Sequence, residues 1–285
     1  MKYRLVLAIA VLGMGVSACS RNQSTTEPPA ELQAFEERIE IRRVWSARVG
    51  RAPERLRLGL APSTDGTRIY AGSYDGQAAA FDVQTGQRQW VTQTNLSLSA
   101  GPAYGDEVLA FGTTDGELIA LDAETGEELW RRSVGSEVLA APAIGNNVVA
   151  LRSVDGQLRG YSMSDGRELW SVVQTVPALT MRGNTAPSVA GTAVVTGFDN
   201  GRLGAYDLSS GDPLWEVTVA MPSGRTELER LVDVSAGLQV VGNDVFAVGY
   251  HGRTIGIALQ TGVVLWQQEL SSYSGLGVDL NGVYV

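Results

Sequence analysis

Short apolar runs alternate with pairs of turn-forming residues along most of the chain. In residues 115–130 an Asp-Gly pair precedes Glu-Leu-Ile-Ala-Leu-Asp, and a Thr-Gly pair separates this run from Glu-Glu-Leu-Trp. Asp, Asn and Gly tolerate the positive φ of tight hairpin turns, and apolar runs this short are typical of strands. Further strands are indicated at 107–111, from Ala103 onward, and at 128–134. The pattern predicts a four-stranded antiparallel sheet.

The same stretch occurs five times, at 75–90, 115–130, 155–170, 200–215 and 251–266. In every copy the second glycine follows the first by ten residues, and a tryptophan follows the second glycine by four. Four-stranded sheets repeated every forty residues or so are typical of the blades of a β-propeller. Each tryptophan is expected to pack against the neighbouring blade, because one sheet cannot bury both of its faces alone. We predict an all-β fold, a β-propeller of four-stranded antiparallel blades spanning residues 34–285, with five complete blades and the start of a sixth.

The two ends of the repeat do not match each other. Trp45 lies in residues 44–49, which resemble the fourth strand of a blade without the first three. In a closed propeller such a strand completes the last blade, yet the sequence after the fifth blade gives only the opening of a sixth, at 277–285. We therefore expect a chain truncated at its C-terminus, with 44–49 poorly paired and the faces of the first and last blades exposed.

The N-terminus has the pattern of an export signal. Lys2 and Arg4 precede the apolar run 5–12, which is too short to span a bilayer. Small residues lead to Cys19, the only cysteine, in an arrangement that resembles the lipobox of bacterial lipoproteins. We expect a lipoprotein signal peptide at 1–18, lipid attachment at Cys19 and a flexible tether over 19–33. The alternative is an ordinary signal peptide followed by a free thiol.

Composition argues against several kinds of chemistry. The net charge of −9, with no lysine after Lys2, argues against nucleic acid as a partner and against catalysis by a lysine Schiff base. The motif acids recur in blade after blade, which indicates a role in turns. The single histidine, His251, replaces the turn Asp of the fifth copy and also tolerates positive φ. No spacing typical of a catalytic triad or a metal site is present, so we predict no catalytic, cofactor-binding or metal-binding residue and a protein that is not an enzyme.

Two loops depart from the repeat length. Successive tryptophans from Trp90 onward lie 40, 40, 45 and 51 residues apart, and the surplus falls at 174–185 and 221–235. Insertions in repeat proteins map to loops on one face, which is often the binding face. The first loop carries Leu179, Met181 and Arg182, residue types that protein interfaces favour. In the alternative interpretation, Leu179 and Met181 only fill the rim of the core.

Taken together, the export signal, the blade pattern and the loop sequences Leu-Thr-Met-Arg-Gly (179–183) and Glu-Arg-Leu-Val-Asp-Val (229–234) resemble the BamB family. These are lipoproteins of the bacterial outer-membrane β-barrel assembly machinery (the BAM complex). The resemblance implies eight blades, so about 110 residues at this repeat length would be absent here. It also implies a lipid-anchored position on the periplasmic face of the outer membrane.

The resemblance further implies that the two loops dock onto the periplasmic POTRA domains of the barrel subunit and that the protein assists β-barrel insertion. The matching docking residues are Leu179, Met181, Arg182 and Asp233, whereas Ser235 stands where the family has a second acid. Unfolded outer-membrane proteins are a further candidate partner. Two alternatives remain: another periplasmic scaffold or sensor, and a quinoprotein dehydrogenase, which shares the blade pattern but usually has a disulfide between adjacent cysteines.

Overall fold

The computed structural model describes residues 40–51, 58–182, 185–234 and 237–285. The chain divides into two compact units, Met1–Arg42 and Arg43–Val285, and every strand belongs to the second. The signal peptide expected at 1–18, the lipid attachment expected at Cys19 and the tether expected at 19–33 all lie outside the described residues. Within the described ranges, no helix has the length and apolar character needed to cross a membrane.

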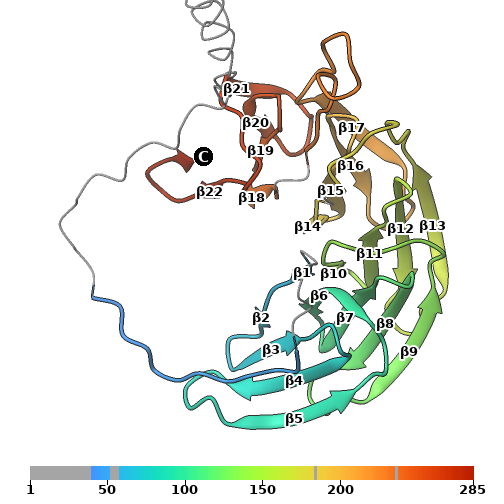
Figure 1. Cartoon of the computed structure of the whole chain (residues 1–285), viewed down its shortest axis with the longest axis vertical. Coiled ribbons are helices and arrows are strands. Elements are labelled where there is room, and N and C mark those ends of the chain that lie inside the picture. The colour runs from blue at the N-terminus through green and yellow to red at the C-terminus, as the bar shows by residue number, and fades with distance from the viewer. Residues whose placement is uncertain (1–39, 52–57, 183–184, 235–236) are drawn as a thin grey trace, which may run out of the picture. The chain divides into compact units, whose positions relative to one another are not determined.

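Five sheets of four antiparallel strands follow one another in chain order, and consecutive strands are neighbours in each (Figure 1). The first sheet contains β2 (Ser63–Thr64), β3 (Arg68–Gly72), β4 (Gln77–Asp82) and β5 (Arg88–Gln93). The second contains β6 (Leu98–Gly105), β7 (Val108–Thr113), β8 (Glu117–Asp122) and β9 (Glu128–Ser133). The third contains β10 (Ala143–Gly145), β11 (Val148–Arg152), β12 (Gln157–Ser162) and β13 (Glu168–Val173).

The fourth sheet contains β14 (Ser188–Ala190), β15 (Ala193–Gly197), β16 (Arg202–Asp207) and β17 (Pro213–Thr218). The fifth contains β18 (Gln239–Val241), β19 (Asp244–Val248), β20 (Thr254–Ala258) and β21 (Val264–Gln268). The last strands, β22 (Gly277–Val278) and β23 (Val283–Tyr284), form a hairpin at the place predicted for the start of a sixth blade. The predicted propeller blades are therefore confirmed.

Two features of the second sheet were not predicted. A short strand, β1 (Gly59–Leu60), pairs in parallel with β6 along the free edge of that sheet. The first strand of this blade was expected from Ala103 onward, but β6 begins at Leu98 and contains Pro102. The register of β6 against β7 shifts between Ala100 and Ala103, so the missing N–H of proline falls where the hydrogen-bond ladder is already interrupted.

The hydrophobic core lies between sheets. Each of four buried clusters joins residues of two consecutive sheets. In one of them Leu118 and Trp130 of the second sheet pack with Val149 and Tyr161 of the third. Because both faces of an inner sheet are covered, its strands are apolar at consecutive positions, as in the fully buried core of β8.

The four junctions between consecutive four-stranded sheets repeat one contact of a tryptophan, and Trp45, which lies in no sheet, makes the same contact with the first sheet. The indole N–H donates a hydrogen bond to a backbone carbonyl of the next sheet, and the acceptor is always three residues before the second glycine of that sheet's motif. The bonds are Trp45 to Val83 (3.0 Å), Trp90 to Ala123 (3.1 Å), Trp130 to Met163 (2.7 Å), Trp170 to Leu208 (2.9 Å) and Trp215 to Leu259 (2.6 Å). The predicted packing of each tryptophan on its neighbouring blade is therefore confirmed for these five.

The same contact explains the second glycine of the motif. At Gly126 the backbone has φ +75°, and a Cβ atom would lie 2.5 Å from Cε3 of Trp90. The backbone conformation and the covering ring both require glycine. Across the strand pair, Trp130 faces Ala120, where the register of β8 against β9 shifts. A small residue there leaves room for the ring.

Residues 40–49 are described, and none lies in a strand. This matches the expectation that 44–49 is poorly paired. Trp45 still donates to Val83 in the first sheet, and a Cβ on Gly86 would lie 2.5 Å from its ring. The side chain therefore takes the place of a fourth-strand tryptophan although its segment is in no sheet.

The glycine requirement gives the first prediction. Gly126→Ala should lower the free energy of unfolding by about 2–5 kcal/mol, because strain at positive φ adds to overpacking against Trp90. Gly135→Ala is the matched control: φ is +78°, but nothing lies within 4 Å of a Cβ, so only about 1–2 kcal/mol is expected. Chemical denaturation measures both, and equal losses would contradict a role for the indole contact.

Candidate functional site

The two predicted loops lie at the same end of the strands as the Asp/Asn-Gly turns. Backbone hydrogen bonds tie each of the first four turns to the loop that leaves the tryptophan-bearing strand, as from Gln174 N to Gly156 O (3.0 Å) and from Val219 N to Gly201 O (2.9 Å). We call this end the loop face. It consists of the turns 73–76, 113–116, 153–156, 198–201 and 249–252 and the loops 94–97, 134–142, 174–182 and 219–234.

The first loop presents its predicted residues at the surface. Leu179 is 41% exposed and Met181 is half-buried. The Arg182 side chain is 61% exposed, and its Nη2 donates to both carboxylate oxygens of Glu137, at 2.6 Å each. Glu137 belongs to the preceding loop of the loop face. Leu179 is thus too exposed to be a core plug, whereas Met181 has a partly structural position.

Both ends of the first loop are anchored. The Gln174 amide donates to Glu216 Oε2 (2.9 Å) and to the Tyr206 hydroxyl (3.1 Å), and accepts from Asn200 Nδ2 (3.4 Å). At the other end, the Thr185 hydroxyl donates to the carbonyl of Val234, in the second loop. The two loops therefore meet, and the first is held between its own blade and the next.

The second loop contains one tight turn and no helix over its described residues, despite the near-helical spacing of Leu228 and Leu231. The Glu229 carboxylate accepts hydrogen bonds from Arg225 N (2.6 Å) and Thr226 N (3.0 Å) and closes the turn. Leu228 is 68% exposed. An exposed apolar side chain beside charged ones is a surface feature that protein partners use.

Asp233 does not lie where a docking residue was expected. Only 1% of it is exposed, and its backbone forms an antiparallel bridge with Tyr250, with Tyr250 N donating to its carbonyl at 2.8 Å. The second loop rejoins the fifth sheet at this point, which draws the residue inward. This burial argues against a direct contact between the Asp233 carboxylate and a partner, and the part of Asp233 in docking stays a prediction.

His251 has a role that the sequence analysis missed. Its φ of +50° fits the predicted turn, but its Nδ1 also lies 3.0 Å from the carbonyl oxygen of Leu231 in the second loop. In the first and third blades the corresponding Asp75 and Asp155 accept hydrogen bonds from serine hydroxyls. A carbonyl needs a donor, so an imidazole N–H suits this place and a carboxylate does not. The one departure from Asp/Asn in this turn was the available signal.

Five of the other motif acids, Asp75, Asp82, Asp122, Asp155 and Asp207, accept hydrogen bonds within their own turns, as predicted. Asp122 Oδ1 accepts hydrogen bonds from Thr125 N (2.8 Å), Glu124 N (2.9 Å) and the Thr125 hydroxyl (3.0 Å). The bond from Thr125 N contributes most to lowering the pKa of this carboxyl, and burial opposes it. Across the described ranges, no group of three or more His, Cys, Asp and Glu side chains could hold a metal ion.

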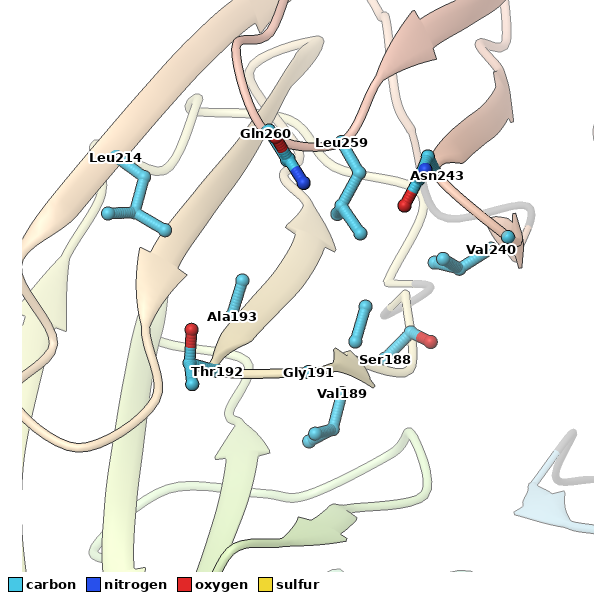
Figure 2. Close-up of a pocket in the computed structure, with 12 residues that line it drawn as sticks. Ser188, Val189, Gly191, Thr192, Ala193, Leu214, Val240, Asn243, Leu259 and Gln260 are labelled. Atoms are coloured by element: carbon cyan, nitrogen blue, oxygen red, sulfur yellow. The ribbon is translucent and has the colours of Figure 1, made fainter.

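A pocket of about 630 Å³ opens between the fourth and fifth sheets, at the end opposite the loop face (Figure 2). Ala190 lines it and occupies the place of Gly105 and Gly145, where a Cβ would lie 2.7 Å from Ile144 and Val189 of the following blade. The extra methyl keeps the fifth blade at a distance. All twelve lining residues are uncharged, and none is His or Cys. The lining holds the hydroxyls of Ser188 and Thr192 but no side chain that could serve them as a general base. The predicted docking residues lie elsewhere.

Tryptophan-linked four-stranded blades, with inserted loops collected on one face, define a β-propeller of the repeat type. The sequence profile described as outer membrane protein assembly factor BamB matches residues 80–285. The chain belongs to the BamB family.

Two curated relatives support this assignment. The outer membrane protein assembly factor BamB of Pseudomonas aeruginosa is 44% identical over 281 residues, which is 99% of this chain and 73% of that protein. The factor of the same name from Marinobacter adhaerens is 56% identical over 266 residues, or 93% of this chain and 68% of the relative.

Solved structures agree on the fold. The crystal structure of BamB from Moraxella catarrhalis superimposes with a TM-score of 0.74 at 27% identity, covering 82% of this chain and 72% of that one. Quinohemoprotein alcohol dehydrogenase from Comamonas testosteroni gives a TM-score of 0.59 at 15% identity, covering 75% and 43%. At that identity the second likeness concerns the fold alone.

The tether from His251 gives the second prediction. His251→Asp should accelerate hydrogen exchange in 221–234 about five- to tenfold, because one hydrogen bond of about 1 kcal/mol is lost and a carboxylate faces the Leu231 carbonyl. His251→Asn is the control, since it keeps a donor and tolerates positive φ. Unchanged exchange in the Asp variant would show that the imidazole does not hold the loop.

Proposed function

We propose that this chain is a non-enzymatic lipoprotein scaffold of the outer-membrane protein assembly machinery. It docks through the loop face onto the periplasmic POTRA domains of the barrel subunit and assists β-barrel insertion. The observation that carries the proposal is the grouping of Leu179, Met181 and Arg182 on an anchored, surface-exposed loop in a member of the BamB family. Cys19 is the proposed lipid attachment site, on the periplasmic face of the outer membrane.

The chemistry of the first loop suits a partner that carries a carboxylate beside an apolar side chain. Arg182 engages Glu137 through Nη2 alone, which leaves Nε and Nη1 for a second acceptor. An ion pair this exposed contributes only about 0–1 kcal/mol, so exchanging or sharing it costs little. Leu179, three residues before Arg182 in the same loop, supplies exposed apolar area, and both arginine and apolar side chains contribute to binding hot spots.

Asp233 has a supporting part in this proposal. Because the residue is buried and its backbone pairs with Tyr250, it holds the second loop against the fifth sheet and does not meet the partner. An Asp233→Arg substitution would therefore disturb folding and cannot report on docking. Arg182 is the residue whose substitution tests the interface.

The third prediction concerns that interface. Arg182→Glu should weaken capture of the barrel subunit's periplasmic domains by about 2 kcal/mol or more, roughly thirtyfold, because a charged contact becomes repulsive. The control Arg167→Glu makes the same change of charge on an exposed residue at the opposite end of the strands. Isothermal titration calorimetry measures both variants, and circular dichroism checks their folding. Equal affinities of Arg182→Glu and the control would place the docking face elsewhere.

The non-enzymatic part has its own support. The motif acids are engaged in their turns, and the chain has one cysteine where the dehydrogenases usually have an adjacent pair.

The fourth prediction is that the purified protein, mixed with pyrroloquinoline quinone and calcium, neither binds the quinone stoichiometrically nor oxidises alcohols or sugars with an electron-accepting dye. Stoichiometric binding with turnover would establish the dehydrogenase alternative. Co-purification of the lipidated protein from solubilised envelopes separates the proposal from another periplasmic scaffold or sensor.

A further inference from the structure

An ion pair is buried between the third and fourth sheets. Arg152, at the end of β11, is fully buried, and its Nη2 donates to Oδ2 of Asp199, which is 4% exposed and follows β15. The guanidinium carbon also lies 5.2 Å from the centroid of the Phe198 ring. Nε and Nη1 have no hydrogen-bond partner among the described residues. Burial raises the pKa of Asp199, with Arg152 opposing the shift, so stability alone gives little reason for this pair.

Both members of the pair depart from the repeat. Gly72, Gly112 and Gly197 occupy the place of Arg152 in the first, second and fourth blades. A Cβ at Gly72 would lie 2.6 Å from Phe111, and a Cβ at Gly112 would lie 2.3 Å from Val138. In these three blades the position admits no side chain because neighbouring residues already fill the space, whereas the fifth blade has the buried Val248 there. The third blade places the largest fully buried side chain of the described chain there.

The sequence of the next loop changes in the opposite direction. Leu98 and Val138, which pack near Gly72 and Gly112, each stand four residues before the proline of the following blade. In the loop before the fourth blade, Gly183 stands at that place in the sequence, although it lies outside the described residues. In the third blade the strand therefore has Arg152 in place of glycine, and the loop that follows has Gly183 in place of a large apolar residue. The exchange occurs at the loop that carries Leu179, Met181 and Arg182.

The pair also connects the two turns that hold this loop. Directly after Arg152, Val154 N donates to the carbonyl of Glu137 (3.0 Å), and the Glu137 carboxylate holds Arg182. The turn of 153–156 also accepts Gln174 N through Gly156 O (3.0 Å). Directly after Asp199, Asn200 donates to the Gln174 side chain. The turn 153–156 therefore bonds to Gln174 directly and to Arg182 through Glu137, and the turn 198–201 also bonds to Gln174.

We infer that the buried Arg152–Asp199 pair is a positioning device for the first inserted loop of the loop face, residues 174–182. It fixes the turns 153–156 and 198–201 relative to each other and so sets the placement of Gln174 and Arg182. A planar guanidinium that is bound to a carboxylate and lies near an aromatic ring is held in one orientation. Contacts between apolar side chains do not fix an orientation in this way. The docking part of the inference rests on the proposed function, whereas the effect on the loop does not.

The test replaces the pair by apolar residues, in Arg152→Met with Asp199→Leu. Such replacements of buried ion pairs often preserve stability, so cooperative unfolding with a midpoint close to that of the unmodified protein is expected. Hydrogen exchange in 174–182 should be five- to tenfold faster, and trypsin should cut after Arg182 at least fivefold faster. Affinity for the barrel subunit's periplasmic domains should fall at least tenfold. The control, Arg131→Gln with Glu128→Gln, removes a partly exposed pair on β9 and should change none of these.

A second variant covers the case in which the apolar pair does not fold. Arg152→Lys keeps the charge but loses the planar fork, and it should accelerate exchange and cleavage in the same direction by about half as much on a logarithmic scale. Unchanged exchange and cleavage in a folded variant would overturn the inference, and so would a loosened loop that docks with full affinity. If the unmodified protein does not bind the periplasmic domains, the proposed function fails, and the exchange and cleavage rates still decide whether the pair positions the loop.

Discussion

The contact between an indole ring and a glycine of the next blade is the constraint on which the rest of the structure depends. The ring covers a backbone segment that has no side chain, and its N–H binds a carbonyl three residues earlier in that segment. Glycine meets two requirements at once, since the backbone has positive φ and the ring leaves no space for a Cβ. This contact explains the two fixed intervals of the motif, ten residues between the glycines and four from the second glycine to the tryptophan. They place the tryptophan on the fourth strand of its blade and the second glycine beneath the tryptophan of the preceding blade.

This regular junction leaves the loop face free to vary. The blades are held by the tryptophan contact and by the apolar clusters between sheets, so the loops need contribute little to stability. The side chains that break the repeat are found near the inserted loops: His251 meets the second loop, and Arg152 with Asp199 lies beside the turns that hold the first. Ala190 is the exception, because it opens a pocket at the other end of the strands.

The sequence predicted what depends on neighbours along the chain. The strands of each blade, the turns of Asp122 and His251 and the packing of the tryptophans follow from short-range turn chemistry and from spacing. The position of Pro102 inside β6 and the pairing of the short strand β1 depend on contacts between segments that are distant in the sequence, and the sequence pattern did not predict them. The burial of Asp233 was also beyond reach, because a loop sequence does not show where the chain rejoins a sheet. Arg152 could have been noticed by aligning the five copies, since glycine occupies its place in three of the others.

The tryptophan contact is also directional, because each of the first four blades donates to the blade that follows it. A blade of this kind carries a complete donor and a complete acceptor within about forty residues. Duplicating or deleting a whole unit would therefore join a donor to an acceptor again without any compensating substitution elsewhere. Changes in blade number are accessible to recombination in a gene built this way, whereas a change of a single junction requires matched substitutions on both sides.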